Sequence, residues 1–342
     1  MHPFARSPAG KVLSVLSLAV ACLCCPQSAY TDSASGFSDP LPAWNDRAAK
    51  KQILDFVHEV TLKGGPDYIP VSERIATFDQ DGTILVEKPF YAQFEYAMDS
   101  VKKVSAKHPE WATEQPFATI LKNDQSALDK MTIEDTEKMI EATHPGISED
   151  GFHKDVADWV ATKKHSRFDK VYPKLVYEPM LELMRYLRAN DFQTYIVTGS
   201  GQEFVRSYAE EVFGVPPQQI AGTTERTKFV YDTGGAPKLM RTDKLMFVCD
   251  RGGKVEAINL VIGRHTCAAF GNSTGDRQML EWAQSGKGKR LLMLVHHDDA
   301  AREYDYGLNT RGGRFTPELM AEAKQRGWVV ISMKDDWKQV FP

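Results

Sequence analysis

The chain has 342 residues, of which 42% are apolar and 26% are charged, a composition typical of a globular protein with one large domain or two modest ones. Lysines and arginines number 42 against 46 aspartates and glutamates, so the net charge is −4. Because no basic run exceeds the pairs at 102–103 and 163–164, the sequence argues against a nucleic-acid-binding protein.

The first 29 residues have the pattern of a secretory signal. Arg6 and Lys11 precede an uncharged apolar run over residues 12–25, which Pro26 ends. A membrane-spanning helix needs about 20 apolar residues, so this run is too short to cross a bilayer. We therefore expect export, to the periplasm of a bacterium, with cleavage near Ala29. A lipid anchor at Cys22 and an uncleaved signal-anchor are the alternatives, and no later segment predicts a membrane span.

Residues 30–44, rich in Ser, Pro and Gly around 33–42, predict a tether between this signal and the folded part. Apolar residues at helical spacing then predict a first helix, which the glycines at 64–65 end. The residues that carry this spacing are Ile53, Phe56, Val57 and Val60.

Short apolar runs alternate with helical patterns through much of the remaining chain. A run of this kind suits a strand that is buried on both faces, and strands alternating with helices indicate a doubly wound parallel sheet in an α/β fold. The predicted strands are 74–78, 194–197, 265–270, 290–295 and 328–331. The catalytic core is accordingly predicted over 45–86 and 178–342.

Residues 87–177 interrupt this alternation. The stretch contains no convincing strand and shows helical periodicity, for example at Phe90, Phe94 and Ala97. Such a length of helix after the first strand is too long for a simple crossover, so we expect an all-helical cap inserted into the core.

Two carboxylates directly follow the first predicted strand. Residues 78–83 read Phe-Asp-Gln-Asp-Gly-Thr, which places Asp79 and Asp81 where parallel sheets bind ligands. Asp79 can attack phosphorus to form an aspartyl-phosphate, and Asp81 can protonate the leaving alcohol and then activate water. A carboxylate facing an anionic ester needs a cation, and Mg²⁺ with oxygen ligands supplies one. A plain polar turn is the alternative interpretation.

Three further segments offer groups for phosphate and metal binding. Thr198 and Gly199 follow the second predicted strand and could hold a phosphate, although such a threonine also suits a cap or turn. Lys254 begins a short helix, where a cation is disfavoured unless an anion lies nearby. Asn272 and Asp276 follow the third predicted strand and offer the hard oxygen ligands that Mg²⁺ prefers, or form a turn and a helix cap.

In this order, the four segments resemble the haloacid dehalogenase superfamily, in its phosphoserine-phosphatase-like branch, over about residues 45–342. The resemblance implies an inserted helical cap and a Mg²⁺-dependent hydrolase of small phosphate monoesters. Residues 295–306 and 333–337 also resemble exported bacterial members of unsettled substrate.

The resemblance also implies residue roles. Asp79 would be the nucleophile and a metal ligand, and Asp81 the acid and base, giving its backbone carbonyl to the metal. Thr198, Gly199 and Lys254 would bind the phosphoryl group. Asn272 and Asp276 would complete the metal site, and their division as direct ligands stays open because many relatives carry Asp where this chain has Asn272.

Several other residues allow more than one interpretation. Glu87, Phe90 and Tyr91 could touch the substrate, and Phe90 could equally pack in the core. The run His296-His297-Asp298-Asp299 suggests a metal site, but no further soft ligand joins it. Cys249 and Cys267 could pair or lie apart. A phosphotransferase and a non-catalytic binding protein on the same fold are the alternative functions.

Overall fold

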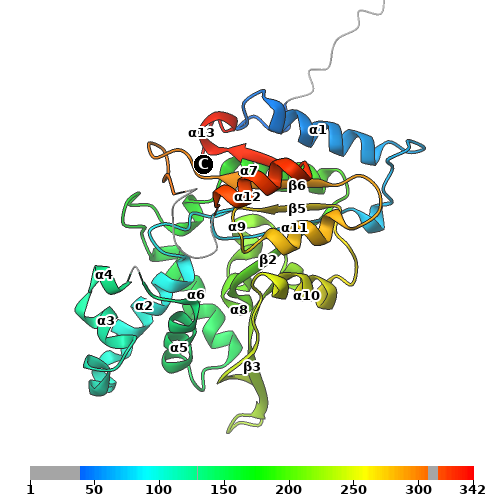
Figure 1. Ribbon diagram of the computed structural model, residues 1–342. Coiled ribbons are helices and arrows are strands. Elements are labelled where there is room, and N and C mark those ends of the chain that lie inside the picture. Colours follow the sequence, from blue (N-terminus) through cyan, green and yellow to red (C-terminus); the bar gives the residue numbers. More distant parts are fainter. Residues whose placement is uncertain (1–38, 129, 307–314) are drawn as a thin grey trace, which may run out of the picture. The chain divides into compact units, whose positions relative to one another are not determined.

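The computed structural model of the protein describes residues 39–128, 130–306 and 315–342 (Figure 1). The predicted signal, Cys22 and residues 30–38 of the predicted tether lie outside the described residues. From Asp39 onward the tether prediction is wrong, because Leu41, Ala43 and Trp44 are buried in the core. None of the helices in the described ranges is long and apolar enough to cross a membrane.

The core is a seven-stranded sheet with the strand order β4-β3-β2-β1-β5-β6-β7. All neighbouring strands are parallel except β3 and β4, which form an antiparallel hairpin at one edge. The strands are β1 (Ile75–Phe78), β2 (Gln193–Gly201), β3 (Ile220–Tyr231), β4 (Pro237–Phe247), β5 (Ala268–Gly271), β6 (Leu291–His296) and β7 (Val329–Ser332). The predicted α/β fold is confirmed, with one antiparallel edge strand added to the parallel sheet.

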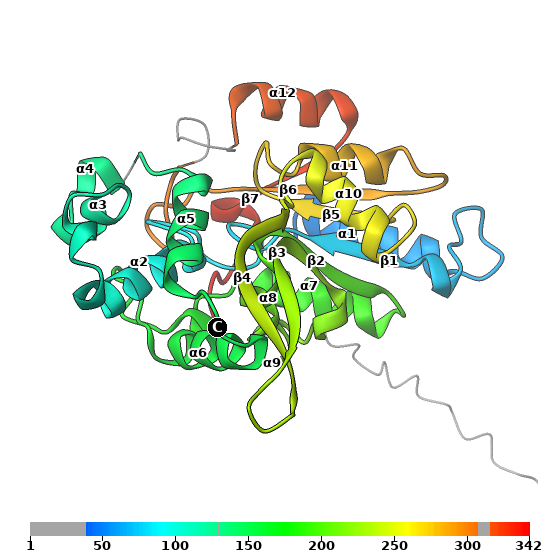
Figure 2. The same cartoon turned by 90° about the horizontal axis from the view of Figure 1, so that it is seen from below.

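Helices cover both faces of this sheet, as Figure 2 shows. The strands are buried on both sides, so neighbouring residues of one strand contribute to two different cores: Ile196 to one and Val197 to the other. The first core receives α1 (Ala48–Thr61) and α7 (Glu178–Ala189). The second receives α10 (Gly252–Val261), α11 (Arg277–Gln284) and α12 (Pro317–Arg326). Shorter helices are α8 (Gln202–Arg206), α9 (Ala209–Phe213) and α13 (Met333–Asp336).

Between β1 and α7 the chain is mostly helical. The helices are α2 (Ala92–Val104), α3 (Phe117–Lys122), α4 (Gln125–Leu128), α5 (Ile133–Thr143) and α6 (Glu149–Thr162). Residues of α2, α3 and α5 form a hydrophobic cluster of their own, separate from the two sheet cores. In Figure 1 these helices lie together, away from α10, α11 and α12. This segment lies where the sequence predicts a cap, and its role as a cap stays a prediction.

The hairpin of β3 and β4 was not predicted from the sequence. In Figure 2 it appears as a long ribbon that reaches beyond the other strands. Its second strand contacts the helical segment, because Met240 forms an isolated bridge with Ser148 and the Arg241 amide donates to the carbonyl of Ile147 at 2.9 Å. The hairpin therefore joins the sheet edge to α5 and α6.

Candidate active site

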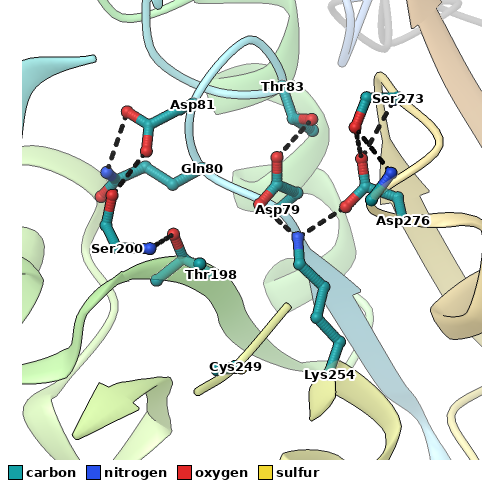
Figure 3. A network of polar contacts seen from close by, with 12 residues as sticks. Asp79, Gln80, Asp81, Thr83, Thr198, Ser200, Cys249, Lys254, Ser273 and Asp276 are labelled. Atoms are coloured by element: carbon teal, nitrogen blue, oxygen red, sulfur yellow. Dashed lines mark hydrogen bonds and ion pairs between the residues drawn. The ribbon is translucent and has the colours of Figure 1, made fainter. Parts of the chain in front are cut away.

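Asp79 and Asp81 lie on the turn that follows β1 (Figure 3). The Asp79 amide donates to the carbonyl of Phe270 at 2.9 Å, so the chain still runs beside β5 where the first carboxylate emerges. Gly82 then has a φ of +76°, which favours glycine, and its amide donates to the carbonyl of Leu85 at 2.8 Å. The chain therefore makes a sharp turn directly after Asp81.

Lys254 brings two of the predicted acidic residues together. Its Nζ donates to Asp79 Oδ1 and to Asp276 Oδ1, each at 2.6 Å, and all three residues are buried. Lys254 lies in the first turn of α10, where the helix dipole disfavours a cation, and the two carboxylates supply the compensating charge. The anionic partner that the sequence predicts for Lys254 is therefore, in the structure, a pair of aspartates.

The loop after β5 places Asn272 and Asp276 differently. Asp276 Oδ2 accepts hydrogen bonds from the amides of Asn272 and Ser273, at 2.9 and 3.1 Å, and from the Ser273 hydroxyl at 3.2 Å. Asn272 Oδ1 lies 3.5 Å from the Thr83 hydroxyl, which is also 3.5 Å from Asp79 Oδ2. Both carboxylate oxygens of Asp276 therefore accept hydrogen bonds from protein groups, whereas the Asn272 amide oxygen lies near Asp79.

Thr198 and Gly199 belong to β2, which continues to Gly201 and so extends past the predicted strand end. Thr198 Oγ1 accepts from the Ser200 amide at 3.1 Å, which leaves its own O–H free to donate elsewhere. The carbonyl of Gly199 accepts from the Thr223 hydroxyl at 2.7 Å. The Gly201 amide donates to Gln93 Oε1 of α2 at 2.7 Å, so a side chain of the helical segment holds this strand end.

Asp81 is oriented by Ser200, a residue that was not predicted from the sequence. The Ser200 hydroxyl donates to Asp81 Oδ2 at 2.7 Å, and the Gln80 side-chain amide donates to Asp81 Oδ1 at 3.3 Å. Ser200 lies in a Thr-Gly-Ser-Gly run, so a hydroxyl two residues after Thr198 was the available signal.

Burial sets the electrostatics of these carboxylates. It raises the pKa of Asp79 well above the ordinary value, with the negative charge of Asp276 adding to the effect. It likewise raises the pKa of Asp81 to about 6, assisted by Glu87 and opposed by the Ser200 hydrogen bond. Burial would lower the pKa of Lys254, but the charges of Asp276 and Asp79 outweigh it and the pKa is raised. Lys254 therefore stays charged, and the site favours an additional cation.

Other predicted residues fall close to the site or away from it. Glu87 is buried, and a Cβ at Gly82 would collide with its carboxyl carbon, so Glu87 lies against the turn that carries Asp79 and Asp81. Phe90 packs on Phe94, with ring centroids 5.0 Å apart, which favours the packing interpretation. Tyr91 precedes α2 and is 37% exposed.

The remaining candidates are structural or separate. Asp298 accepts from the Ser332 hydroxyl and the Lys334 amide, so it holds the chain after β7. Cys249 and Cys267 are both buried and unpaired.

Comparison with known proteins identifies the family. The model of the haloacid dehalogenase-like hydrolases matches residues 76–281. No curated protein matches the sequence.

Several solved structures are similar to this chain at low sequence identity. A conserved protein of unknown function from Anaerococcus prevotii DSM 20548 has a TM-score of 0.57 at 14% identity, over 88% of this chain and 97% of that one. A protein of unknown function from Bordetella pertussis Tohama I has a TM-score of 0.48 at 18% identity, over 76% and 98%. A phosphoserine phosphohydrolase-like protein from Francisella tularensis has a TM-score of 0.34 at 15% identity, over 65% and 87%. From the family match, which covers more than half of its length, the chain belongs to the haloacid dehalogenase-like hydrolases.

Proposed function

We propose that the protein is an exported, Mg²⁺-dependent phosphomonoester hydrolase that works through an aspartyl-phosphate. The observation that carries this proposal is the pairing of two carboxylates on one turn. Asp79 is held at 2.6 Å by Lys254, and Asp81 is held separately at 2.7 Å by Ser200. Two carboxylates in different environments can take the different roles of nucleophile and acid.

Asp79 is the proposed nucleophile. One of its oxygens forms a bond to phosphorus as the ester P–O bond breaks, and the departing alkoxide takes a proton from Asp81. A water molecule then attacks the phospho-aspartate, giving its proton to Asp81 and releasing inorganic phosphate and Asp79. The pKa of Asp81, raised to about 6 by burial, keeps the two protonation states of this residue close in energy near neutral pH.

The phosphoryl group is proposed to bind between Thr198 and Lys254. The Thr198 hydroxyl is free to donate because its oxygen accepts from the Ser200 amide, and Lys254 supplies the charge. The amides of Ser200 and Gly201 are already donated to protein acceptors, so the phosphate site rests on these side chains. Gly199 has no side chain that would block the phosphate from reaching Thr198.

The donor set fits a magnesium ion. Asp79 and Asp276 both contact the ammonium group of Lys254, and Asp79 and Asn272 both offer hard oxygens beside Thr83. Asp79, Asn272 and the Asp81 carbonyl are the proposed direct ligands. Asp276 is proposed to orient Lys254 and the loop, because both of its oxygens are taken. When bound, Mg²⁺ would offset the repulsion between Asp79 and the phosphate.

Turnover of an aryl phosphate by the mature protein tests the proposal. We expect hydrolysis that requires Mg²⁺ and stops with a chelator, and no hydrolysis by Asp79→Asn, whose amide is a poor nucleophile. Asp81→Asn should still form phospho-enzyme from an aryl ester, since that leaving group needs no proton. Equal turnover by the wild type and Asp79→Asn would refute the mechanism. Mg²⁺-dependent loss of ester without release of phosphate, in the presence of an acceptor alcohol, would indicate the phosphotransferase instead.

A further inference from the structure

A buried histidine at the end of β6 contacts the catalytic turn directly. His297 is 1% exposed, and its Nε2 lies 2.7 Å from the carbonyl oxygen of Gly82. On the other side of the ring, Nδ1 lies 3.2 Å from Glu303 Oε2. The ring also stacks on Tyr306, with centroids 4.3 Å apart. These contacts connect β6 to the residue that follows Asp81.

Both ring nitrogens of His297 face oxygens that accept hydrogen bonds. A backbone carbonyl can only accept, so Nε2 carries a hydrogen. Glu303 also accepts from the Tyr177 hydroxyl at 3.2 Å and from the Tyr304 amide at 2.6 Å, which fixes its side chain beside the ring. Burial would lower the pKa of His297, but the hydrogen bond and the charge of Glu303 outweigh it and raise the pKa, which favours an imidazolium paired with Glu303. This use of both nitrogens also argues against the metal interpretation of the histidine run.

The carbonyl that His297 contacts belongs to Gly82, the residue at which the chain turns after Asp81. Gly82 has a φ of +76°, and a Cβ there would collide with the side chains of Asn272 and Glu87. The Gly82 amide is fixed by Leu85 at 2.8 Å, so His297 fixes the other end of the same residue. A shift of this residue would move Asp81, which precedes it, and Asn272, which lies against it.

We propose that His297 is a positioning residue that holds the catalytic turn through the Gly82 carbonyl, with Glu303 keeping its ring charged and oriented. This inference rests on the proposed phosphatase function. Its main consequence concerns the proton that Asp81 gives to the leaving group. An ester with a poor leaving group needs that proton, whereas an aryl ester does not, so loss of His297 harms the two unequally.

The experiment compares His297→Ala and His297→Gln with the wild type on 4-nitrophenyl phosphate and on glycerol phosphate. Misplacement of a catalytic group by about 1 Å costs on the order of 100-fold in rate, so we expect kcat of His297→Ala to fall about 100-fold on glycerol phosphate and about tenfold on the aryl ester. Gln can donate to the Gly82 carbonyl, so His297→Gln should recover most of the loss. His296→Ala is the matched control, because His296 packs on Phe315 and pairs with Asp298, and its kcat should equal that of the wild type.

Equal losses on both esters, with His297→Gln no better than His297→Ala, would overturn the inference, as would wild-type rates in both variants. Because His297→Ala leaves a buried carboxylate unpaired, its folding is checked by circular dichroism. If it does not fold, Glu303→Gln decides: it should show the larger loss on glycerol phosphate, and equal losses on the two esters would overturn the inference. Asp79→Asn, assayed alongside, separates the two proposals: turnover by that variant would refute the phosphatase mechanism, whereas an inactive Asp79→Asn with unaffected His297 variants would refute only the role of His297.

Discussion

Two of the buried cations in the described part of the chain, Lys254 and Arg241, each lie between two carboxylates. Lys254 joins Asp79 and Asp276 at the ends of β1 and β5. Arg241 of the hairpin pairs with Glu149 of α6, at 3.2 Å, and with Glu225 of β3. The two cations are almost equally buried, at 3% and 5% exposure.

Their surroundings differ in charge. The Arg241 guanidinium lies 3.8 Å from the centre of the Phe152 ring. Next to Arg241 and its two carboxylates, a second cation, Arg206, pairs with Glu203. Glu149, His153 and Glu203 have the spacing of a metal site, yet each already has a side-chain partner. Beside Lys254, by contrast, the negative charge of Asp81 adds to those of Asp79 and Asp276. The Arg241 cluster, whose carboxylates all have side-chain partners, thus joins elements of the fold. The Lys254 cluster, which has more carboxylates than cations, suits the binding of an added cation.

The largest expected effect comes from removing the cation of the acidic site. In Lys254→Met, Asp79 and Asp276 lose their common partner, and the phosphoryl group loses the positive charge that would bind it. We therefore expect kcat on an aryl phosphate to fall on the order of 1,000-fold. Denaturant unfolding without Mg²⁺ should show a loss of about 3 kcal/mol, since breaking a buried pair leaves uncompensated charge. Added Mg²⁺ should restore more stability to this variant than to the wild type. A kcat above about a tenth of the wild-type value would contradict this role.

Removing the other cation should affect stability and leave the chemistry largely intact. Arg241→Met leaves Glu149 and Glu225 buried without a partner, so we expect a loss of about 3 kcal/mol in the free energy of unfolding. The rate per folded molecule should stay within about threefold of the wild type, because this ion pair holds α6 to the hairpin and has no contact with Asp79. Lys228→Met, at an exposed position of the same hairpin, is the control and should change stability by less than about 0.5 kcal/mol. A loss of activity as large as that of Lys254→Met would end the distinction between the two clusters.

A smaller effect is expected from adding a charge to the acidic site. In Asn272→Asp, a carboxylate replaces the amide beside Asp79, so Coulomb attraction should lower the Mg²⁺ concentration for half-maximal rate by about tenfold. Asn272→Ala should raise that concentration, because it removes the proposed ligand oxygen. If neither variant moves the half-maximal concentration, Asn272 does not hold the metal.

The predicted part of the site follows from local signals. Asp79, Thr198, Lys254, Asn272 and Asp276 each stand beside a strand end or helix start that the sequence marks by an apolar run and glycines, and parallel strands bring such ends to one edge. Two contacts could not be predicted in this way, because their partners are far apart in the sequence and no periodicity marks them. Ser200 is 119 residues from Asp81, and His297 is 215 residues from Gly82.

The hairpin escaped prediction for a different reason. Its strands mix charged with apolar residues, and one face stays open to solvent, with Phe229 and Tyr231 59% and 69% exposed, so no buried run marks it. The Val, Tyr, Phe and Thr content of β3 and the Gly-Gly turn at 234–235 were the available signals. Leu41 and Trp44 were missed because single apolar residues within a Ser- and Pro-rich stretch carry no period.

The smallest expected effect concerns a buried carboxylate whose hydrogen-bond donor is a backbone amide. Glu182 of α7 accepts from the Ala43 amide, at 2.8 and 3.1 Å to its two oxygens, and so fastens the segment before α1. Burial raises the pKa of Glu182 to about 7, against 4.5 ordinarily, although the Ala43 hydrogen bond opposes the shift. The folded state therefore binds the proton more tightly than the unfolded state. Its stabilising contribution is complete below about pH 4.5 and is lost as pH rises through about 7.

Glu182→Gln tests this sign, because its amide oxygen can still accept from Ala43 while carrying no charge. We expect the variant to match the wild type near pH 5 and to exceed it by about 1 kcal/mol near pH 8, a value reduced for the partial solvent contact of the group. Denaturant unfolding at the two pH values measures the difference, with exposed Glu211→Gln as the control. A wild type that gains stability relative to Glu182→Gln as pH rises would mean that the charged carboxylate is the favoured form. The Ala43 amide alone would then stabilise a buried negative charge. Glu182 would in that case be a buried carboxylate that needs no cation, unlike the carboxylates beside Lys254 and Arg241.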